Sequence, residues 1–318
     1  MSTRAAAFVT TATAAILARA RAAPAFDYAA MEMAEARALF ARNNAYWNRV
    51  DVPLPEIRDM SLPGPAGAMR ARLYRPQGGA AALPVLLYVH GGGWTFGDVD
   101  THDRCMRILA QESGAAVLGF DYRLAPEHPF PAALDDTRAA LAWIRAHGAR
   151  SGLDAGRIAI GGDSAGANIA LAALAAERDA GAPALAGAAL FYGCYAPLHD
   201  TESHRRFGAG DFVLSTSRMR WYWRNYLGDL PEDTTALAVP LRADLRDLPR
   251  LFLNAAGLDP LLDDTILLAG RLAHAGTPYE LDLIPGVIHG CMQQTAEEPA
   301  AAAGLSRAAA YLARALAR

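Results

Sequence analysis

The chain has 318 residues, of which 53% are hydrophobic and 20% charged, and its formal net charge is −3. This composition excludes a disordered chain and is sufficient for a substantial core. The small net charge and the absence of a basic run exclude an electrostatic basis for binding DNA, RNA or an anionic membrane surface. There is also no uninterrupted apolar stretch of about 20 residues, so no membrane span is predicted.

The cysteines favour a reducing compartment. There are three of them, Cys105, Cys194 and Cys291, and no two form a C-x-x-C unit. An odd number without that spacing predicts neither a disulfide framework nor a thiolate zinc site. We therefore expect a cytoplasmic protein.

Residues 1–45 are predicted to be helical, because they are rich in alanine and carry apolar residues at helical spacing. The run from Arg4 to Ala18 superficially resembles a signal peptide. However, threonines dilute the run, and Arg19 and Arg21 follow where a small-residue cleavage site should lie. We expect this segment to form an N-terminal helical cap instead of a cleaved signal.

From residue 57 onward the pattern changes to strands. Residues 57–62 and 69–74 flank a Pro/Gly-rich turn and predict an antiparallel hairpin. Further strands are predicted at 84–89, 115–122, 157–161, 185–192, 250–255 and 279–284, and helices at about 102–113, 132–148, 165–180, 260–275 and 297–317. This alternation predicts an α/β catalytic domain over 46–318, with a mostly parallel sheet covered by helices on both faces.

One connection, at about 196–245, is too long to be an ordinary loop between two buried strands. It contains aromatic residues on a short helical pattern, namely Trp221, Tyr222, Trp223 and Tyr226. Such an insertion typically covers a site. We predict that it forms a cap together with the N-terminal helices.

Ser164 lies in the sequence GDSAG, residues 162–166, between a predicted strand and a predicted helix. A strand that turns sharply into a helix strains the residue at the turn, so small residues are needed two positions before and after it. Gly162 and Gly166 meet that need. The amides at the start of the helix would face developing negative charge at the serine. Ser164 is therefore the candidate nucleophile.

A serine hydroxyl needs a base, and the base needs an orienting acid. His289 follows the last predicted strand, whereas the other seven histidines do not, and Asp259 follows the preceding strand. Strand C-termini are where open α/β sheets place their sites, and the chain order serine, acid, histidine fits such a sheet. Asp263 and Asp264 remain as alternative acids in the helix that begins near Pro260.

The sequence HGGG, residues 90–93, follows the buried strand 84–89. Consecutive glycines allow backbone amides to face a substrate, so this loop and Ala165 could bind an oxyanion. A phosphate cradle is disfavoured because no G-K-[ST] follows. His90 is expected to anchor the loop. Trp94 either narrows the acyl pocket or is an ordinary core tryptophan.

In combination, these motifs resemble those of the bacterial hormone-sensitive-lipase-like esterases. The resemblance rests on HGGG and GDSAG, on the block DYRLAPEHPFPAALDD at 121–136, and on DPL at 259–261 and HG at 289–290. It covers residues 55–315, approximately. It implies an α/β-hydrolase fold of eight strands with an N-terminal and inserted cap. It also implies carboxylesterase activity on short acyl chains, without a metal or other cofactor.

The resemblance also implies roles for individual residues. The amides of Gly92, Gly93 and Ala165 would form the oxyanion hole, with Gly91 shaping the loop. Glu127 and Asp135 would support loops near the site. Further candidates, for contacting the substrate, are Trp94, Tyr195 and Trp221.

The sequence departs from the family at Cys291, where members commonly carry an apolar or aromatic residue. Cys291 could alter the pocket, and Cys194 could lie near its acyl side; both are interpreted as small buried residues.

Alternative functions can also be considered for this sequence. An amidase, a lactonase or an arylformamidase would need the same triad, and a receptor on this fold would be expected to lack it. A metal site at His199 and His204 is disfavoured, because that spacing does not place both on one helix face. We expect a small-molecule ester as the partner. A homodimer is compatible with the sequence but is not determined by it.

Overall fold

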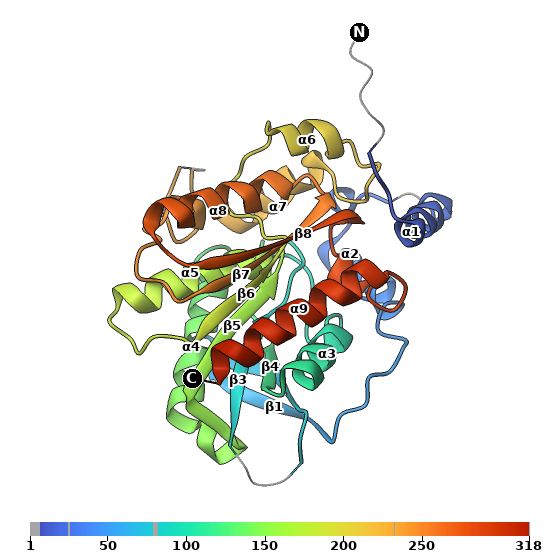
Figure 1. The fold of residues 1–318 in the computed structure, drawn as a ribbon. Coiled ribbons are helices and arrows are strands. Elements are labelled where there is room, and N and C mark those ends of the chain that lie inside the picture. Colours follow the sequence, from blue (N-terminus) through green and yellow to red (C-terminus); the bar gives the residue numbers. More distant parts are fainter. Residues whose placement is uncertain (1–6, 25, 79–81, 232, 318) are drawn as a thin grey trace.

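A computed structural model describes residues 7–24, 26–78, 82–231 and 233–317 of the chain. Eight strands form one sheet in the order β1-β2-β4-β3-β5-β6-β7-β8 (Figure 1). The pairings of β2 with β1 and with β4 are antiparallel, and all the others are parallel. The strands are β1 Glu56–Gly64, β2 Gly67–Arg75, β3 Leu83–Val89, β4 Ala116–Phe120, β5 Leu153–Asp163, β6 Gly187–Phe191, β7 Leu251–Leu258 and β8 Tyr279–Ile288.

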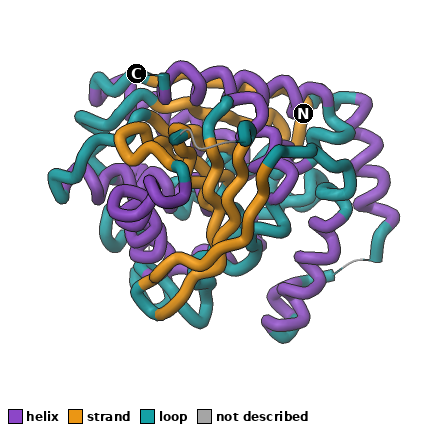
Figure 2. Tube along the Cα trace, turned by 90° about the horizontal axis from the view of Figure 1, so that it is seen from below, coloured by secondary structure: helices purple, strands orange, loops and turns teal. Residues whose placement is uncertain are grey.

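Helices cover both faces of the sheet, as Figure 2 shows. One face packs against α3 and α9, and the opposite face packs against α4, α5 and α8. These five helices are α3 Asp103–Ser113, α4 Ala132–His147, α5 Ala165–Asp179, α8 Leu262–Ala275 and α9 Pro299–Leu316.

The central strands are apolar throughout because both of their faces are buried. In β3, Leu86 and Tyr88 belong to the core on the side of α3 and α9. Val85 and Leu87 alternate with them and belong to the larger core on the other side. The alternation of side chains along a strand thus divides the interior into two apolar layers.

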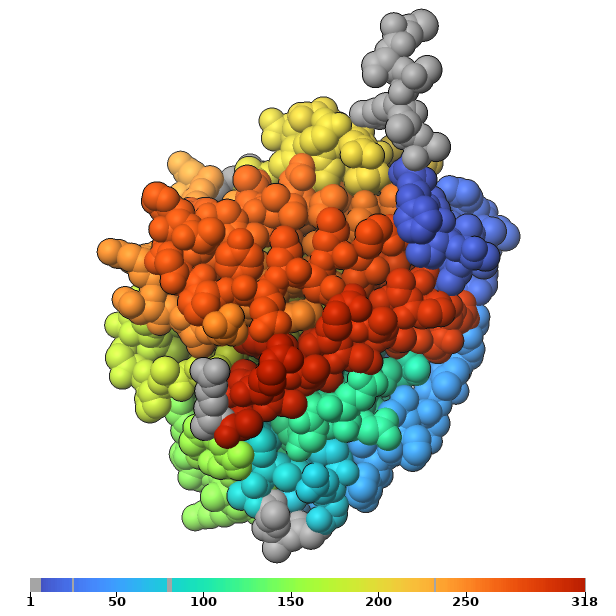
Figure 3. All heavy atoms as spheres, viewed as in Figure 1, coloured from blue at the N-terminus to red at the C-terminus, as the bar shows by residue number. Residues whose placement is uncertain are grey.

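Four further helices lie at the carboxyl ends of the parallel strands: α1 Thr11–Ala22, α2 Met33–Ala45, α6 Glu202–Phe207 and α7 Thr216–Leu227. Arg37 of α2 donates to the carbonyl oxygen of Thr95 at 3.0 Å, in the loop after β3. At the surface, α1 lies against the C-terminal part of the chain, where Arg19 pairs with Glu297 at 2.8 Å (Figure 3). Segments far apart in sequence therefore meet over the edge of the sheet that carries the candidate site.

The predicted fold class is confirmed, including the hairpin and all eight strands, although strand ends differ. The strand predicted at 279–284 continues to Ile288, so that Pro285 and Gly286 lie within β8 instead of in a loop. His289 therefore follows the last residue of β8 directly. Among the described residues, no helix is both long and apolar enough to cross a bilayer.

Candidate active site

Ser164 occupies a strained turn between β5 and α5. Its backbone angles are φ 55° and ψ −119°, a conformation that side chains rarely adopt. A Cβ atom at Gly162 or at Gly166 would overlap the carbonyl oxygen of Val89 on β3. The two glycines are thus required by close approach of the backbone, as the sequence predicted. The turn presents the serine side chain at the end of the sheet.

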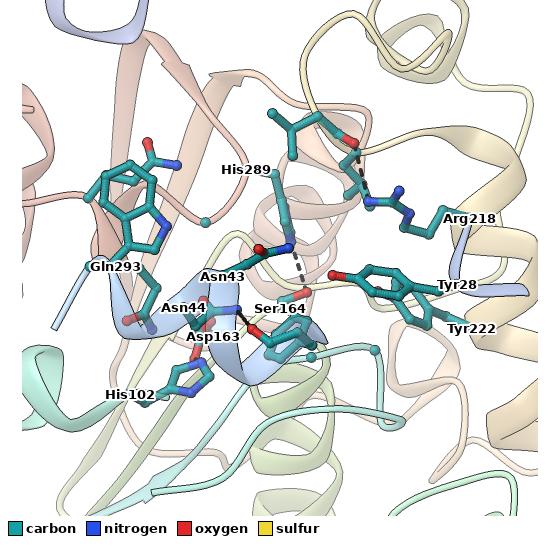
Figure 4. Close-up of a pocket in the computed structure, with 18 of the residues that line it drawn as sticks. Tyr28, Asn43, Asn44, His102, Asp163, Ser164, Arg218, Tyr222, His289 and Gln293 are labelled. Atoms are coloured by element: carbon teal, nitrogen blue, oxygen red, sulfur yellow. Dashed lines mark hydrogen bonds and ion pairs between the residues drawn. The ribbon is translucent and has the colours of Figure 1, made fainter. Parts of the chain in front are cut away.

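A hydrogen-bonded chain joins Ser164, His289 and Asp259, and Figure 4 shows its contact between Ser164 and His289. The Ser164 Oγ atom lies 2.9 Å from His289 Nε2. The other ring nitrogen, Nδ1, lies 2.7 Å from Asp259 Oδ2 and donates to it. The ring nitrogen facing the serine is then free to accept its proton.

Asp259 is the acid that the structure brings to the histidine, and its side chain has no solvent-exposed surface. Its second oxygen accepts from the Leu261 amide at 2.9 Å. The two rival acids are engaged elsewhere. Asp263 accepts from the Ser203 amide at 2.8 Å, and Asp264 accepts from the Tyr195 amide at 2.8 Å. Both rivals lie in the first turn of the helix that begins at Leu262.

The triple-glycine loop lies beside Ser164. Gly92 and Gly93 line the same cavity as the serine, with φ values of 123° and 61°. Among the residues that the structure describes, the amides of Gly92, Gly93 and Ala165 have no recorded hydrogen-bond acceptor. Unpaired amides beside a serine can receive an oxyanion. Gly91 is different, because its amide donates to Asp163 Oδ1 at 3.0 Å.

Asp163 is a residue whose position sequence reasoning missed. It precedes the serine, lines the cavity and accepts from Tyr88 Oη at 2.9 Å. The Nε2 atom of His102 lies 3.3 Å from the same carboxylate oxygen. Burial raises the pKa of Asp163, but the neighbouring His102 and the hydrogen bonds outweigh that effect and keep the pKa below its ordinary value. The carboxylate therefore ties the oxyanion loop to the nucleophile turn.

His90 anchors the loop, as its sequence position suggested. Its Nδ1 atom donates to the carbonyl oxygen of Gly91 at 2.9 Å, and its ring stacks on Tyr122 with centroids 4.2 Å apart. Tyr122 Oη in turn donates to the His90 carbonyl at 2.9 Å. Burial lowers the pKa of His90 to about 4, so the ring is neutral at ordinary pH.

The cavity at Ser164 has a volume of about 240 Å³. The lining comes from the sheet edge and also from α2 and α7; its larger side chains are Phe26, Tyr28, Phe40, Asn43, Asn44, Trp47, His102, Arg218, Met219, Tyr222, His289, Gln293 and Gln294. Most of the lining outside the sheet edge comes from the two segments predicted from the sequence to form a cap. The sequence pattern predicted helices there and included Tyr222 in an aromatic cluster, but it did not predict which side chains face the cavity.

The three predicted substrate contacts, Trp94, Tyr195 and Trp221, do not appear in this lining. Trp94 is buried and stacks on Tyr226 with centroids 4.2 Å apart. Tyr195 is fully buried, and Trp221 lines a separate surface hollow. For Trp94 the geometry corresponds to the alternative of a core tryptophan.

In the block at 121–136, one of the two residues expected to support the site does so and the other does not. Glu127 binds Arg37 of α2 with two hydrogen bonds of 2.8 and 2.6 Å. Asp135 is exposed, and its neighbour Asp136 makes the buried ion pair with Arg123 at 2.8 Å. The expectation for Asp135 is therefore corrected to Asp136.

The cysteines and the remaining histidines lie outside this site. Cys105, Cys194 and Cys291 are buried free thiols, and none is among the cavity-lining residues. The His204 Nδ1 atom lies 2.9 Å from Thr216 Oγ1, and its ring packs edge-on against His199.

Comparison with known proteins finds an α/β-hydrolase family and relatives that are named as esterases. Residues 86–293 match the family described as alpha/beta hydrolase fold. Esterase LipI of Mycobacterium tuberculosis is 39% identical over 260 residues, covering 80% of this chain and 81% of that protein. The Acetyl esterase of Salmonella schwarzengrund is 35% identical over 256 residues, covering 80% and 78%. The chain spans 64% of the longer Carboxylic ester hydrolase LipN of Mycobacterium tuberculosis, which is 40% identical over 74% of this chain.

A solved structure with this fold is the hyperthermophilic esterase from the archaeon Pyrobaculum calidifontis. It superimposes with a TM-score of 0.92 at 32% identity, covering 96% of this chain and 98% of that one.

Proposed function

Because this chain belongs to the α/β-hydrolase family, and within it to the bacterial hormone-sensitive-lipase-like esterases, we propose that it hydrolyses carboxylic esters of short acyl chains. Ser164 is the nucleophile, His289 the base and Asp259 the orienting acid. The observation that carries the proposal is the hydrogen-bonded chain through the three residues, with distances of 2.9 and 2.7 Å.

The reaction has two acyl-transfer steps. In the first, His289 Nε2 takes the proton from Ser164 Oγ as that oxygen attacks the ester carbonyl carbon. The carbonyl oxygen becomes negative and is bound by the amides of Gly92, Gly93 and Ala165. His289 then gives its proton to the departing alcohol oxygen. In the second step water attacks the acyl-enzyme by the same route and releases the acid.

Asp259 keeps the imidazole in the tautomer that leaves Nε2 free, and it stabilises the ring once it is protonated. Its complete burial strengthens that interaction, because few water molecules screen it.

The cap assignment supports a preference for short acyl chains. We assign residues 1–45 and about 196–245 to a cap; residues 1–6 and 25 of the first segment lie outside the described chain. Side chains of α2 and α7 close the cavity to about 240 Å³, below the roughly 300–1,000 Å³ of ordinary ligand pockets.

Replacement of the nucleophile tests the proposal. We expect Ser164→Ala to lower kcat on p-nitrophenyl acetate by about 10⁶-fold, because without the hydroxyl no acyl-enzyme forms. A serine-directed phosphonate should label the wild-type protein once, at Ser164, and should not label the variant. Substantial activity in Ser164→Ala would place the chemistry elsewhere.

A series of p-nitrophenyl esters from acetate to palmitate tests the acyl preference. We expect kcat/KM to be highest at short chains and to fall as the chain outgrows the cavity. Each methylene of the acyl chain contributes roughly 0.8 kcal/mol when the cavity buries it. A maximum of kcat/KM above about ten carbons would mean that the cavity buries a long chain, and it would overturn the short-chain proposal. Faster turnover of p-nitroacetanilide than of the acetate would instead indicate an amidase.

We also propose a cytoplasmic location and a homodimer. Three buried free thiols support a reducing compartment. The edge strand β8 supports pairing with a second copy, since Leu281 and Leu283 are 42% and 45% exposed on it. Light scattering of the wild-type protein should give twice the monomer mass. Leu283→Arg in β8 should reduce this to the monomer mass. Leu230→Arg, at an exposed position in the loop after α7, should leave the dimer mass unchanged. A monomeric wild-type protein would contradict the dimer.

A further inference from the structure

Arg218 lies on the wall of the cavity, in the first turn of α7. That turn begins at Thr216, is capped by Ser215, and contains no acidic residue. The amino end of a helix carries partial positive charge, so a cation there is disfavoured. The position of Arg218 therefore costs stability unless an anion offsets it.

Among the described residues, no aspartate or glutamate forms an ion pair with Arg218, although Asp27 lines a neighbouring surface hollow with it. Its recorded contacts are a long hydrogen bond of 3.5 Å to the Val213 carbonyl oxygen and the faces of two rings. Its guanidinium carbon lies 5.2 Å from the centre of Tyr28 and 5.8 Å from that of Phe26.

The carboxylate that does line the cavity is already occupied. Asp163 accepts from the Gly91 amide and from Tyr88, and it lies next to His102. Figure 4 shows Arg218, Tyr28 and Tyr222 on one side of Ser164, with His102 on the other. The guanidinium and the Asp163 carboxylate thus belong to opposite sides of the site.

The cavity lining also contains the apolar and aromatic side chains of Leu214, Met219 and Tyr222. A neutral polar group, Asn43, is hydrogen-bonded to Tyr28. Burial raises the pKa of Tyr222, and the positive charge of the neighbouring Arg218 opposes that rise. In such surroundings a charge pair is screened less than in bulk water. A guanidinium also matches the two oxygens of a carboxylate.

We propose that Arg218 binds a carboxylate on the substrate, so that this enzyme prefers esters that carry a second, ionised carboxyl group. Arg218 is a specificity-determining residue in this proposal and takes no part in bond breaking. The inference rests on the proposed esterase function. It deepens that function by naming the substrate class: half-esters of dicarboxylic acids, or acyl esters of hydroxy acids.

Two matched pairs of substrates test whether the carboxylate lies on the acyl part or on the alcohol part of the ester. Monomethyl adipate against methyl heptanoate places the charge on the acyl side. Para-acetoxybenzoate against its methyl ester places it on the alcohol side. For wild-type protein we expect kcat/KM to favour the charged member of one pair by about tenfold, as a charge-assisted hydrogen bond would give. The preference should weaken as salt is added.

Arg218→Met should abolish the preference within each pair, chiefly by raising KM for the charged member relative to the neutral one. Arg218→Lys should retain part of it. Arg220→Met is the matched control: Arg220 is exposed on the same helix, outside the cavity lining, and its loss should leave all four substrates unaffected.

Two results would overturn the inference: wild-type protein that favours the neutral member in both pairs, or Arg218→Met that keeps the wild-type preference. Failure of the proposed function looks different. In that case none of the four esters is turned over by any variant, and the serine-directed phosphonate leaves Ser164 unlabelled.

Discussion

Two histidine–aspartate pairs flank Ser164, and they are built for different tasks. His289 and Asp259 lie 2.7 Å apart, and the same imidazole reaches the serine oxygen at 2.9 Å. His102 and Asp163 lie 3.3 Å apart, and the second nitrogen of His102 faces Thr101 Oγ1 at 2.9 Å.

The two pairs differ in the further hydrogen bonds that each carboxylate accepts. Asp163 accepts from the Gly91 amide and the Tyr88 hydroxyl as well as facing His102, so its position is fixed from several directions. Asp259 is tied to its own turn through the Leu261 amide and otherwise serves His289. We therefore propose that the same two residue types move a proton on one side of Ser164 and hold the backbone of the triple-glycine loop on the other.

The largest effect should come from the proton-moving pair. Asp259→Asn should lower kcat on p-nitrophenyl acetate by about 10³–10⁴-fold, because an amide favours the wrong imidazole tautomer. Steady-state kinetics at pH 7 would measure it.

The matched control is Asp263→Asn, since Asp263 holds the Ser203 amide and not the histidine. We expect kcat of this variant to stay within about threefold of wild type, because an asparagine keeps an oxygen for the Ser203 amide. A greater loss in Asp263→Asn than in Asp259→Asn would reverse the assignment of the acid.

The loop-holding pair should give an intermediate effect. Asp163→Asn keeps an oxygen for the Gly91 amide but removes the charge that His102 faces, so we expect kcat to fall by about tenfold. The pH–rate profile should keep its shape, because His289 and Asp259 are untouched.

A thousandfold loss in Asp163→Asn, together with a shifted profile, would break the comparison and place Asp163 in the proton path. Equal folding of the two variants should be verified by thermal unfolding, since both carboxylates are buried.

The smallest expected effect is on stability and comes from Asp264, whose hydrogen-bond partners among the described residues are backbone amides and not a histidine. Burial raises its pKa to about 8, and its Oδ2 atom has no recorded partner among the described residues. The folded protein therefore holds a proton that the unfolded chain, with a pKa of about 4, has lost. Wild-type stability should fall as pH rises between those two values.

Asp264→Asn removes this titration. We expect the Tm difference, variant minus wild type, to be larger at pH 8 than at pH 5 by at least about 2 °C. Calorimetry at the two pH values measures the shift, and Asp263→Asn should show none. A Tm difference that stays constant with pH would mean that Asp264 is ionised in the folded protein.

The sequence alone determined the parts of this protein that depend on local backbone geometry. Gly162 and Gly166 mark a turn into which no Cβ fits, and the triple glycine marks a loop with open amides. Ser164, Asp259 and His289 follow strands β5, β7 and β8 of one sheet, in that chain order. These signals are short in sequence and need no knowledge of distant contacts.

Only the tertiary structure decided which residues line the cavity at Ser164. Tyr28, Arg218 and Tyr222 meet at the cavity from segments nearly two hundred residues apart, and no periodic pattern encodes that meeting. The same holds for Asp163, whose role depends on His102 and on the Gly91 amide. Packing of α2 and α7 over the sheet edge is a sum of many weak, long-range contacts, whereas the nucleophile turn is fixed by its own few residues.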